Sequence, residues 1–380
     1  MRVCLVYDCL YPYTVGGAER WYRNLADQVA SRGHEVTFLT RRQWARGSDP
    51  NLPGIRVIAV APRLRLYARG RRRIVPPLLF GLGVLGHLVR HGAEYDVVHT
   101  ASFPYFSLLA AGAARRRGGF RLVVDWHEIW TRGYWREYLG PVAGRIGWRV
   151  QRACLRMPQR AFCFSQLHER RLRELGLRGE LTRLEGQYAG PRDPVRRRPP
   201  RPVAVFAGRH IPEKRVPALL PALVQARERI PDLRGEIYGD GPERADVLKA
   251  VAELGLDGSV TAPGFVAAAV LSEAVASALC LVLPSRREGY GLVVIEAAAS
   301  GVPVVVVAGP DNAATELVEE GVNGAVAASS AHGDLAAAIV RIHDAGPALR
   351  ESAADWFRRN ADRLSFERSL ERVLEAYAGA

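Results

Sequence analysis

The chain has 380 residues, of which 48% are hydrophobic and 24% are charged, and its formal net charge is +14. This length exceeds one ordinary domain and predicts a two-domain α/β protein. No apolar stretch reaches the 18 residues that suggest a membrane-spanning helix, and the first residues lack the layout of a secretory signal, so we expect a cytoplasmic protein.

The positive charge is concentrated in the first half of the chain. Residues 1–190 carry 31 arginines against 14 acidic residues, residues 191–202 carry a net +4, and residues 203–380 carry a net −7. This asymmetry indicates an anionic partner for the first half, such as nucleic acid, a membrane surface or a phosphorylated substrate. Arginine outnumbers lysine 51 to 2, however, so a coding bias and a solvated surface explain the charge equally well.

The cysteines predict no disulfide framework. They are odd in number, form no C-x-x-C pair and mostly stand in apolar strings, which favours buried thiols over disulfides or a metal cage. They are Cys4, Cys9, Cys154, Cys163 and Cys280.

Along the first half, apolar runs typical of strands alternate with longer segments of helical spacing. A strand at 3–9 precedes a helix at 16–33, which Gly33 ends. The intervals between the runs are long enough for crossover helices, so we expect a parallel, doubly wound sheet. Further strands are predicted at 34–40, 55–61, 96–101, 121–126 and 160–165.

Residues 191–202 are rich in proline and arginine and predict a linker between domains 1–190 and 203–355. The strand pattern then restarts, and the chain closes with a helical pattern that has one or two breaks, whose last part, 356–380, we expect as a terminal helix. The second set of strands is predicted at 203–208, 234–239, 259–264, 279–285, 302–309 and 324–328.

In such folds the chemistry gathers at the carboxyl ends of the strands. Gly16 and Gly17 follow the first strand and open a helix, where an anion can approach the free amides, although a tight turn explains the pair as well. His127 follows the strand 121–126 beside aromatic and acidic neighbours. A lone histidine is usually structural, but this position raises the odds of a functional one.

The second half offers cations and carboxylates at the corresponding positions. Arg209 and Lys214 follow the strand 203–208 and could converge on a pair of phosphates, although a solvated surface lysine remains an alternative. Glu288 lies in a glycine-flanked loop, and Glu296 lies about two turns into the following apolar helix. A glutamate is almost never fully buried without a partner, so Glu296 needs either solvent or a polar ligand.

A second glycine pattern is set aside. Gly81, Gly83 and Gly86 match G-x-G-x-x-G, but they follow two prolines rather than a clean strand and turn. A dinucleotide-binding fingerprint needs a strand, a turn and a helix in that order. We therefore interpret this stretch as an apolar helix.

Together with the turn Gly239-Asp240-Gly241-Pro242, whose composition by itself needs no function, these residues resemble family 4 of the retaining nucleotide-sugar glycosyltransferases. The specific part is Glu288, the EGYG turn and Glu296, followed by the block 301–326, "GVPVVVVAGPDNAATELVEEGVNGAV". The similarity covers nearly the whole chain. It implies a GT-B fold, in which two Rossmann-like domains face each other across a cleft and the terminal helix 356–380 packs on the first domain.

The resemblance also implies the roles of the site residues. Arg209 and Lys214 would bind the donor diphosphate, Glu296 the ribose hydroxyls and Glu288 the transferred sugar, while the roles of His127 and Glu288 in the chemical step stay open. The catalytic set would be Glu288, His127, Arg209 and Lys214. The remaining donor-binding positions would be Gly16, Gly17, Gly289, Tyr290, Gly291 and Leu292.

No Asp-x-Asp occurs in the sequence, so we expect no metal ion. The resemblance implies no cofactor, with the nucleoside-diphosphate sugar as a co-substrate. The acceptor would be a hydroxyl of a lipid-linked, polysaccharide or natural-product glycoside. Basic segments of the first domain suit a phosphorylated lipid at the inner face of a membrane, and a soluble acceptor fits about as well. Two other classes stay open: an epimerase-like enzyme of the same fold, and a basic protein that binds nucleic acid or another anion. Nucleic-acid binding is disfavoured because it gives the two glutamates no role.

Overall fold

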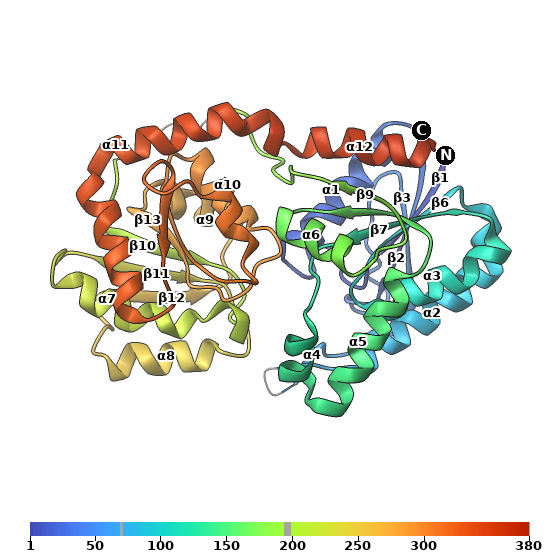
Figure 1. The fold of residues 1–380 in the computed structure, drawn as a ribbon, viewed down its shortest axis with the longest axis horizontal. Coiled ribbons are helices and arrows are strands. Elements are labelled where there is room, and N and C mark those ends of the chain that lie inside the picture. The colour runs from blue at the N-terminus through green and yellow to red at the C-terminus, as the bar shows by residue number, and fades with distance from the viewer. Residues whose placement is uncertain (69–70, 194–198, 380) are drawn as a thin grey trace. The chain divides into compact units, whose positions relative to one another are not determined.

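The computed structural model of the chain describes residues 1–68, 71–193 and 199–379. The chain divides into two compact units (Figure 1). The first unit combines Met1–Glu185 with Ser369–Ala380, and the second is Gly186–Arg368. Residues 194–198 of the predicted linker lie outside the described residues.

The first unit is built on a parallel sheet of seven strands in the order β3-β2-β1-β6-β7-β8-β9. The central strands are buried along nearly their whole length because helices cover both faces, which agrees with the continuous apolar runs of the sequence. The strands are β1 Arg2–Val6, β2 Glu35–Arg41, β3 Ile55–Ala61, β6 Val97–Ala101, β7 Arg121–Trp126, β8 Gln159–Cys163 and β9 Gly179–Arg183. A short antiparallel pair, β4 Tyr67–Ala68 and β5 Arg71–Arg72, lies outside this sheet.

Two features of the first unit differ from the sequence-based expectation. The first strand ends at Val6 rather than at residue 9, and the edge strand β9 was not predicted, because its mostly polar and exposed residues give no apolar signal. The helices are α1 Gly17–Ser31, α2 Val75–His91, η1 Gly92–Glu94, α3 Tyr105–Gly118, α4 Arg132–Leu139, α5 Pro141–Leu155 and α6 Gln166–Glu174.

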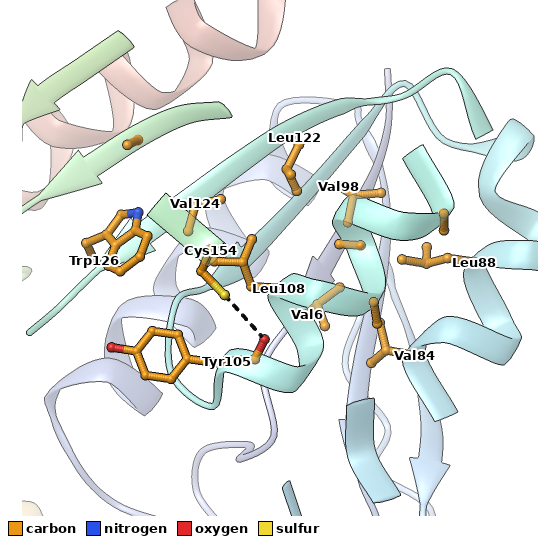
Figure 2. Packing of buried hydrophobic residues seen from close by; sticks show 14 of the residues in the cluster. Val6, Val84, Leu88, Val98, Tyr105, Leu108, Leu122, Val124, Trp126 and Cys154 are labelled. Carbon is orange, nitrogen blue, oxygen red and sulfur yellow. Dashed lines mark hydrogen bonds between the residues drawn. The ribbon is translucent and has the colours of Figure 1, made fainter. Parts of the chain in front are cut away.

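Helices α2, α3 and α5 pack on the same face of the first sheet through one hydrophobic cluster (Figure 2). Leu108 of α3 and Cys154 of α5 join strand residues such as Val124, and the Cys154 thiol donates to the carbonyl oxygen of Tyr105 at 3.9 Å. All five cysteines are buried and free, as predicted.

The glycine pattern that was set aside does lie in a helix, α2, and two of its glycines serve packing. A Cβ atom on Gly83 would lie 1.9 Å from the carbonyl oxygen of Val60, and one on Gly81 would lie 2.5 Å from the Cβ of Phe106. Close contact of α2 with β3 and α3 therefore requires glycine at both positions.

The second unit repeats the same design with six parallel strands in the order β12-β11-β10-β13-β14-β15. The two parallel sheets with flanking helices confirm the expected α/β class with two doubly wound units. The strands are β10 Val203–Ala207, β11 Arg234–Tyr238, β12 Val260–Gly264, β13 Cys280–Leu283, β14 Val304–Val307 and β15 Gly324–Ala327. The helices are η2 Pro212–Lys214, η3 Val216–Ala218, α7 Leu219–Arg227, α8 Arg244–Glu253, α9 Ala268–Ala276, α10 Leu292–Ala299, η4 Ala313–Leu317 and α11 His332–Leu364.

A predicted break near the carboxyl terminus is visible in the backbone. Within the predicted closing pattern, 351–378, the break is at Ser365: α11 ends before it and α12 runs over Phe366–Ala378. A non-helical residue of α11, Gly346, precedes that segment and was not predicted. From Ser369 onward the chain belongs to the first unit. Among the helices of the described residues, none is long and apolar enough to cross a membrane.

Candidate functional site

The order of the second sheet reverses between the neighbouring strands β10 and β13. Ligands of open α/β sheets bind outside the carboxyl ends of the strands at such a switch point. The loop after β10 carries Arg209 and leads to η2, and the loop after β13 carries Glu288 and leads to α10. Two segments 74 residues apart in sequence, those of Lys214 and Glu288, thus meet at this edge.

The centre of this edge is an ion pair between Lys214 and Glu288. The Lys214 Nζ lies 2.5 Å from the Glu288 Oε1, and the two side chains are 19% and 9% exposed. The backbone amide of Arg286 donates to the carbonyl oxygen of Glu213 at 2.8 Å, so the two loops are also joined through their main chains. The pair therefore places a cation and a carboxylate at the edge where open α/β sheets bind their ligands.

A second set of bonds holds the Glu288 loop against the segment that follows β14. The amide of Glu288 donates to the carbonyl oxygen of Asp311, and the amide of Ala313 donates to that of Glu288. Arg287 pairs with Asp311 at 3.2 Å. The side-chain amide of Asn312 donates to the carbonyl oxygens of Ser285, in the Glu288 loop, and Val307, at the end of β14. These supporting residues were not singled out from the sequence, although 311–313 belong to the block that carried the resemblance.

Arg209 is half-buried, and it lies where the loop after β10 packs closely against the turn after β11. Gly239 has a φ of +111°, and a Cβ atom there would lie 1.9 Å from the carbonyl oxygen of Gly208. Gly241 likewise leaves room for the carbonyl oxygen of His210. The glycines of the turn after β11 therefore allow this turn to pack against the loop that presents Arg209, which is a structural role.

Four predicted donor-binding residues, 289–292, lie at the start of α10 and in the loop before it. Gly291 has a φ of +104°, and a Cβ atom there would approach that of Ala314 to 2.8 Å, so this position requires glycine. Leu292 is the first residue of α10, and its helix N-terminus offers amides that can accept an anion. Gly289 is half-buried and Tyr290 is buried in the loop before it.

Glu296 is the fifth residue of α10, a little over one turn from its start and not two as expected. It is half-buried, which agrees with the expectation that an ionised glutamate needs solvent or a polar ligand. Burial and the neighbouring Glu296 raise the pKa of Tyr188 to about 12, so this phenol is neutral and can donate.

In the first unit, His127 directly follows β7, as predicted. Its ring stacks on Phe164 with centroids 4.8 Å apart, and it meets the edge of Tyr22. Its Nε2 is buried without a hydrogen-bond partner among the described residues. Burial lowers the pKa of His127 despite the opposing charges of Asp125 and Glu128, so the ring is neutral near pH 7.

Gly16 and Gly17 lie at the same sheet edge as His127, at the start of α1. Gly16 has extended backbone, and a Cβ atom on Gly17 would have no neighbour within 4 Å. Gly17 therefore has no steric need to be glycine within its own unit. The open space beside it is compatible with a ligand.

A buried polar network lies beneath His127 and was not predicted. Asp125 accepts a hydrogen bond from the Trp21 indole at 2.8 Å and pairs with the His99 Nε2 at 2.9 Å. The other ring nitrogen of His99 bonds the Tyr377 hydroxyl at 2.6 Å, which ties α12 to the first sheet. Burial alone would raise the pKa of Asp125, but His99, His127 and Trp21 hold it below its usual value.

Comparison with known proteins finds a family model for each of the two units. The family model "Glycosyl transferase 4-like domain" matches residues 16–185, and the model "Glycosyl transferases group 1" matches residues 201–345. A D-inositol 3-phosphate glycosyltransferase of Thermomonospora curvata is 32% identical over 401 residues, which covers 96% of this chain and 91% of that protein.

Solved structures share the fold over the full length of the chain. A sucrose-phosphate synthase of Thermosynechococcus elongatus has a TM-score of 0.79 at 21% identity and covers 100% of this chain and 98% of its own. The Anabaena protein HepE, solved in complex with UDP-glucose, has a TM-score of 0.76 at 19% identity and covers 100% of both chains.

Proposed function

The chain belongs to the family 4 glycosyltransferases of the GT-B fold, and we propose that it transfers a sugar from a nucleoside-diphosphate donor to a hydroxyl acceptor with retention of configuration and without a metal ion. The observation that carries the proposal is the pair of Lys214 and Glu288 at the switch point of the second sheet. It supplies a cation for a diphosphate and a carboxylate for a sugar at one place.

The donor diphosphate is the group that this edge fits best. Departure of the diphosphate from the sugar builds negative charge on the leaving phosphate oxygens, and preorganised cations and amides stabilise such charge. Lys214, Arg209 and the amides at the start of α10 are the groups available for this role. Since the sequence contains no Asp-x-Asp, these groups take the place of a metal clamp.

Glu296 and Glu288 have different tasks in this proposal. Glu296, half-buried on α10, accepts hydrogen bonds from the ribose hydroxyls. Glu288 orients the transferred sugar and stabilises the positive charge that develops at its anomeric carbon, as carboxylates do in glycoside hydrolysis. His127 of the first unit is neutral, and its unpartnered Nε2 is available to bond a sugar hydroxyl.

The transfer breaks the bond from the anomeric carbon to the phosphate oxygen and forms a bond from that carbon to the acceptor oxygen. The acceptor loses its proton, and the departing phosphate oxygen accepts it. The UDP-glucose complex of HepE supports a nucleotide-sugar donor. We propose that the acceptor binds the first unit.

The test is thermal unfolding of the purified protein with a panel of nucleoside diphosphates and their sugar derivatives. A ligand that binds only the folded state raises the melting temperature. We expect a shift with one nucleoside-diphosphate series that is lost in Arg209→Ala but kept in the control Arg229→Ala, an exposed arginine of the same unit. If no nucleotide shifts the melting temperature, or if both variants respond alike, the donor site is wrongly assigned.

A further inference from the structure

A fully buried acid, Asp125, lies near the end of β7, two residues before His127. Its carboxylate accepts a hydrogen bond from the Trp21 indole of α1 at 2.8 Å and pairs with His99 of β6 at 2.9 Å. The hydroxyl group of Tyr377, on α12, bonds the other ring nitrogen of His99. We call Trp21, His99, Asp125 and Tyr377 the Asp125 network, in which four elements meet at one buried charge.

The fold by itself does not require a charge at this position. The second unit repeats the same design, and its strands around the switch point, β10, β13 and β14, consist of apolar residues alone. Burying an ionised carboxylate costs free energy even when it is paired, and a well-packed apolar residue of similar size is often at least as stable. Stability of the sheet therefore does not explain why the first unit has His99 and Asp125 in its central strands.

The network contacts His127 through two aromatic side chains. The Trp21 ring lies edge-on to Phe164 with centroids 5.1 Å apart, and Phe164 in turn stacks on His127 at 4.8 Å. Tyr22, the residue after Trp21, packs edge-on against both His99 and His127. By holding α1 in place, the network therefore fixes both rings that contact His127.

Asp125 also acts on His127 through its charge. Burial lowers the pKa of His127, the charges of Asp125 and Glu128 oppose this shift, and His99 adds to it. Tyr22 on α1 is neutral, because burial and the neighbouring Asp125 raise its pKa well above the usual value. Among the charged neighbours of His127, Asp125 thus has the largest effect.

The same carboxylate fixes the other predicted site element of the first unit. Trp21 lies about one turn after Gly17, the first residue of α1, so its bond to Asp125 holds the start of this helix at the sheet. The two first-unit elements with a predicted role at the donor, Gly16 with Gly17 and His127, therefore depend on one buried acid.

We propose that Asp125 is the positioning residue of His127 in the proposed sugar transfer, and that Tyr377 includes the terminal helix α12 in this task. Asp125 holds α1, and with it the rings against His127, so that the Nε2 of His127 keeps its place for a sugar hydroxyl. Tyr377 holds the His99 ring that pairs with the carboxylate, so the effect of α12 reaches His127 through Asp125. The inference rests on the proposed function, because the sugar contact of His127 belongs to it.

The first experiment needs no substrate and records the ring signals of His127 by NMR in the full chain with isotope-labelled histidine. The stacked Phe164 ring shifts these signals upfield, so they report the position of the imidazole, and His127→Gln identifies them. We expect Asp125→Asn and Tyr377→Phe each to displace the signals. If Asp125→Asn does not fold, Trp21→Phe replaces it, because that variant removes the indole donor and keeps a ring beside Phe164.

A core variant outside the network controls for lost stability. Val84 of α2 belongs to the same hydrophobic cluster as Val98 and Val124, which each precede a network residue on their strand. Successive side chains of a strand point to opposite faces, so this cluster lies on the other face of the sheet from the network. Val84→Ala should therefore lower the melting temperature and leave the His127 signals in place.

The second experiment is calorimetry with the nucleoside diphosphate that gives the largest thermal shift and with its sugar derivative. Asp125→Asn and Tyr377→Phe should bind the diphosphate like the unaltered protein, because that group is assigned to the second unit. They should bind the sugar derivative about twofold to tenfold more weakly, which corresponds to the loss of one hydrogen bond. His127→Ala should show the same pattern, and Val84→Ala should bind both compounds normally.

The outcomes separate the inference from the proposed function. If His127→Ala weakens binding of the sugar derivative but neither Asp125→Asn nor Tyr377→Phe does, the inference is overturned and the proposed function stands. Unmoved His127 signals in both network variants, or equal displacement in Val84→Ala, would overturn the inference as well. If His127→Ala binds the sugar derivative normally, the sugar contact of His127 is wrongly assigned, and the inference fails with it.

Discussion

The ion pair of Lys214 and Glu288 allows a prediction in which two variants of the same contact act differently. If Lys214 binds the donor diphosphate, Lys214→Ala removes one charge-assisted contact, which is worth about 1.5 to 3 kcal/mol. The affinity for the nucleoside diphosphate should then fall by about 10-fold to 150-fold. The loss belongs at the upper end, because the carboxylate of Glu288, only 9% exposed, would be left without its cation beside the incoming phosphates.

Glu288→Gln should behave otherwise. It removes the charge that competes for the Lys214 ammonium group, so the nucleoside diphosphate should bind at least as tightly, while turnover falls because the sugar loses its carboxylate. Combined with Lys214→Ala, the same change should restore part of the lost affinity, since two residues in direct contact do not act additively.

The assay is isothermal titration calorimetry with the nucleoside diphosphate that gives the largest thermal shift, followed by turnover with its sugar derivative. The chain offers a matched control, because Lys249 is its only other lysine and lies exposed on α8. Lys249→Ala should bind and turn over normally. Equal affinities of the two lysine variants, or an affinity loss in Glu288→Gln as large as in Lys214→Ala, would refute this account of the pair.

Two further predictions concern the first unit. Tyr377→Phe leaves the buried Nδ1 of His99 without its partner at 2.6 Å, so the free energy of unfolding should fall by about 1 to 3 kcal/mol, measured by urea unfolding, whereas Tyr13→Phe at an exposed position should change little. Burial, aided by the charge of His91, lowers the pKa of His87 to about 4, below the value of about 6.5 in the unfolded chain. The unfolded chain therefore binds the extra proton first, and stability is lost as the pH falls from about 6.5 to 4. His87→Gln should show a smaller drop in melting temperature across this window, and an unchanged drop would speak against the burial effect.

Much of the fold could be predicted because most strands are recognisable in the sequence as short apolar runs. Buried strands of a parallel sheet are continuous apolar runs, so those of both units stood out from the sequence, whereas the mostly polar edge strand β9 did not. Lys214 and Glu288 could be placed on the same sheet edge since each follows a predicted strand. Their distance of 2.5 Å could not be predicted, because it depends on how the two loops fold.

The supporting parts of the site are harder to predict because they depend on close packing of loops. Gly239 and Gly291 look like ordinary turn residues in the sequence. The structure gives each a positive φ and a neighbour too close for a Cβ atom, so their need for glycine comes from the segments that pack against them.

The sequence by itself determined the two α/β units, the buried free cysteines and the strand ends at which chemistry gathers, because these follow from local patterns of apolar residues and turns. Only the tertiary structure decided which distant residues meet. His99 and Tyr377 are 278 residues apart and share one hydrogen bond. Helices α2, α3 and α5 pack in one layer on the first sheet, and all their charged residues other than histidine are arginines. Such contacts join segments that are far apart in the sequence. They depend on how the whole chain packs, so local patterns of apolar and polar residues do not predict them.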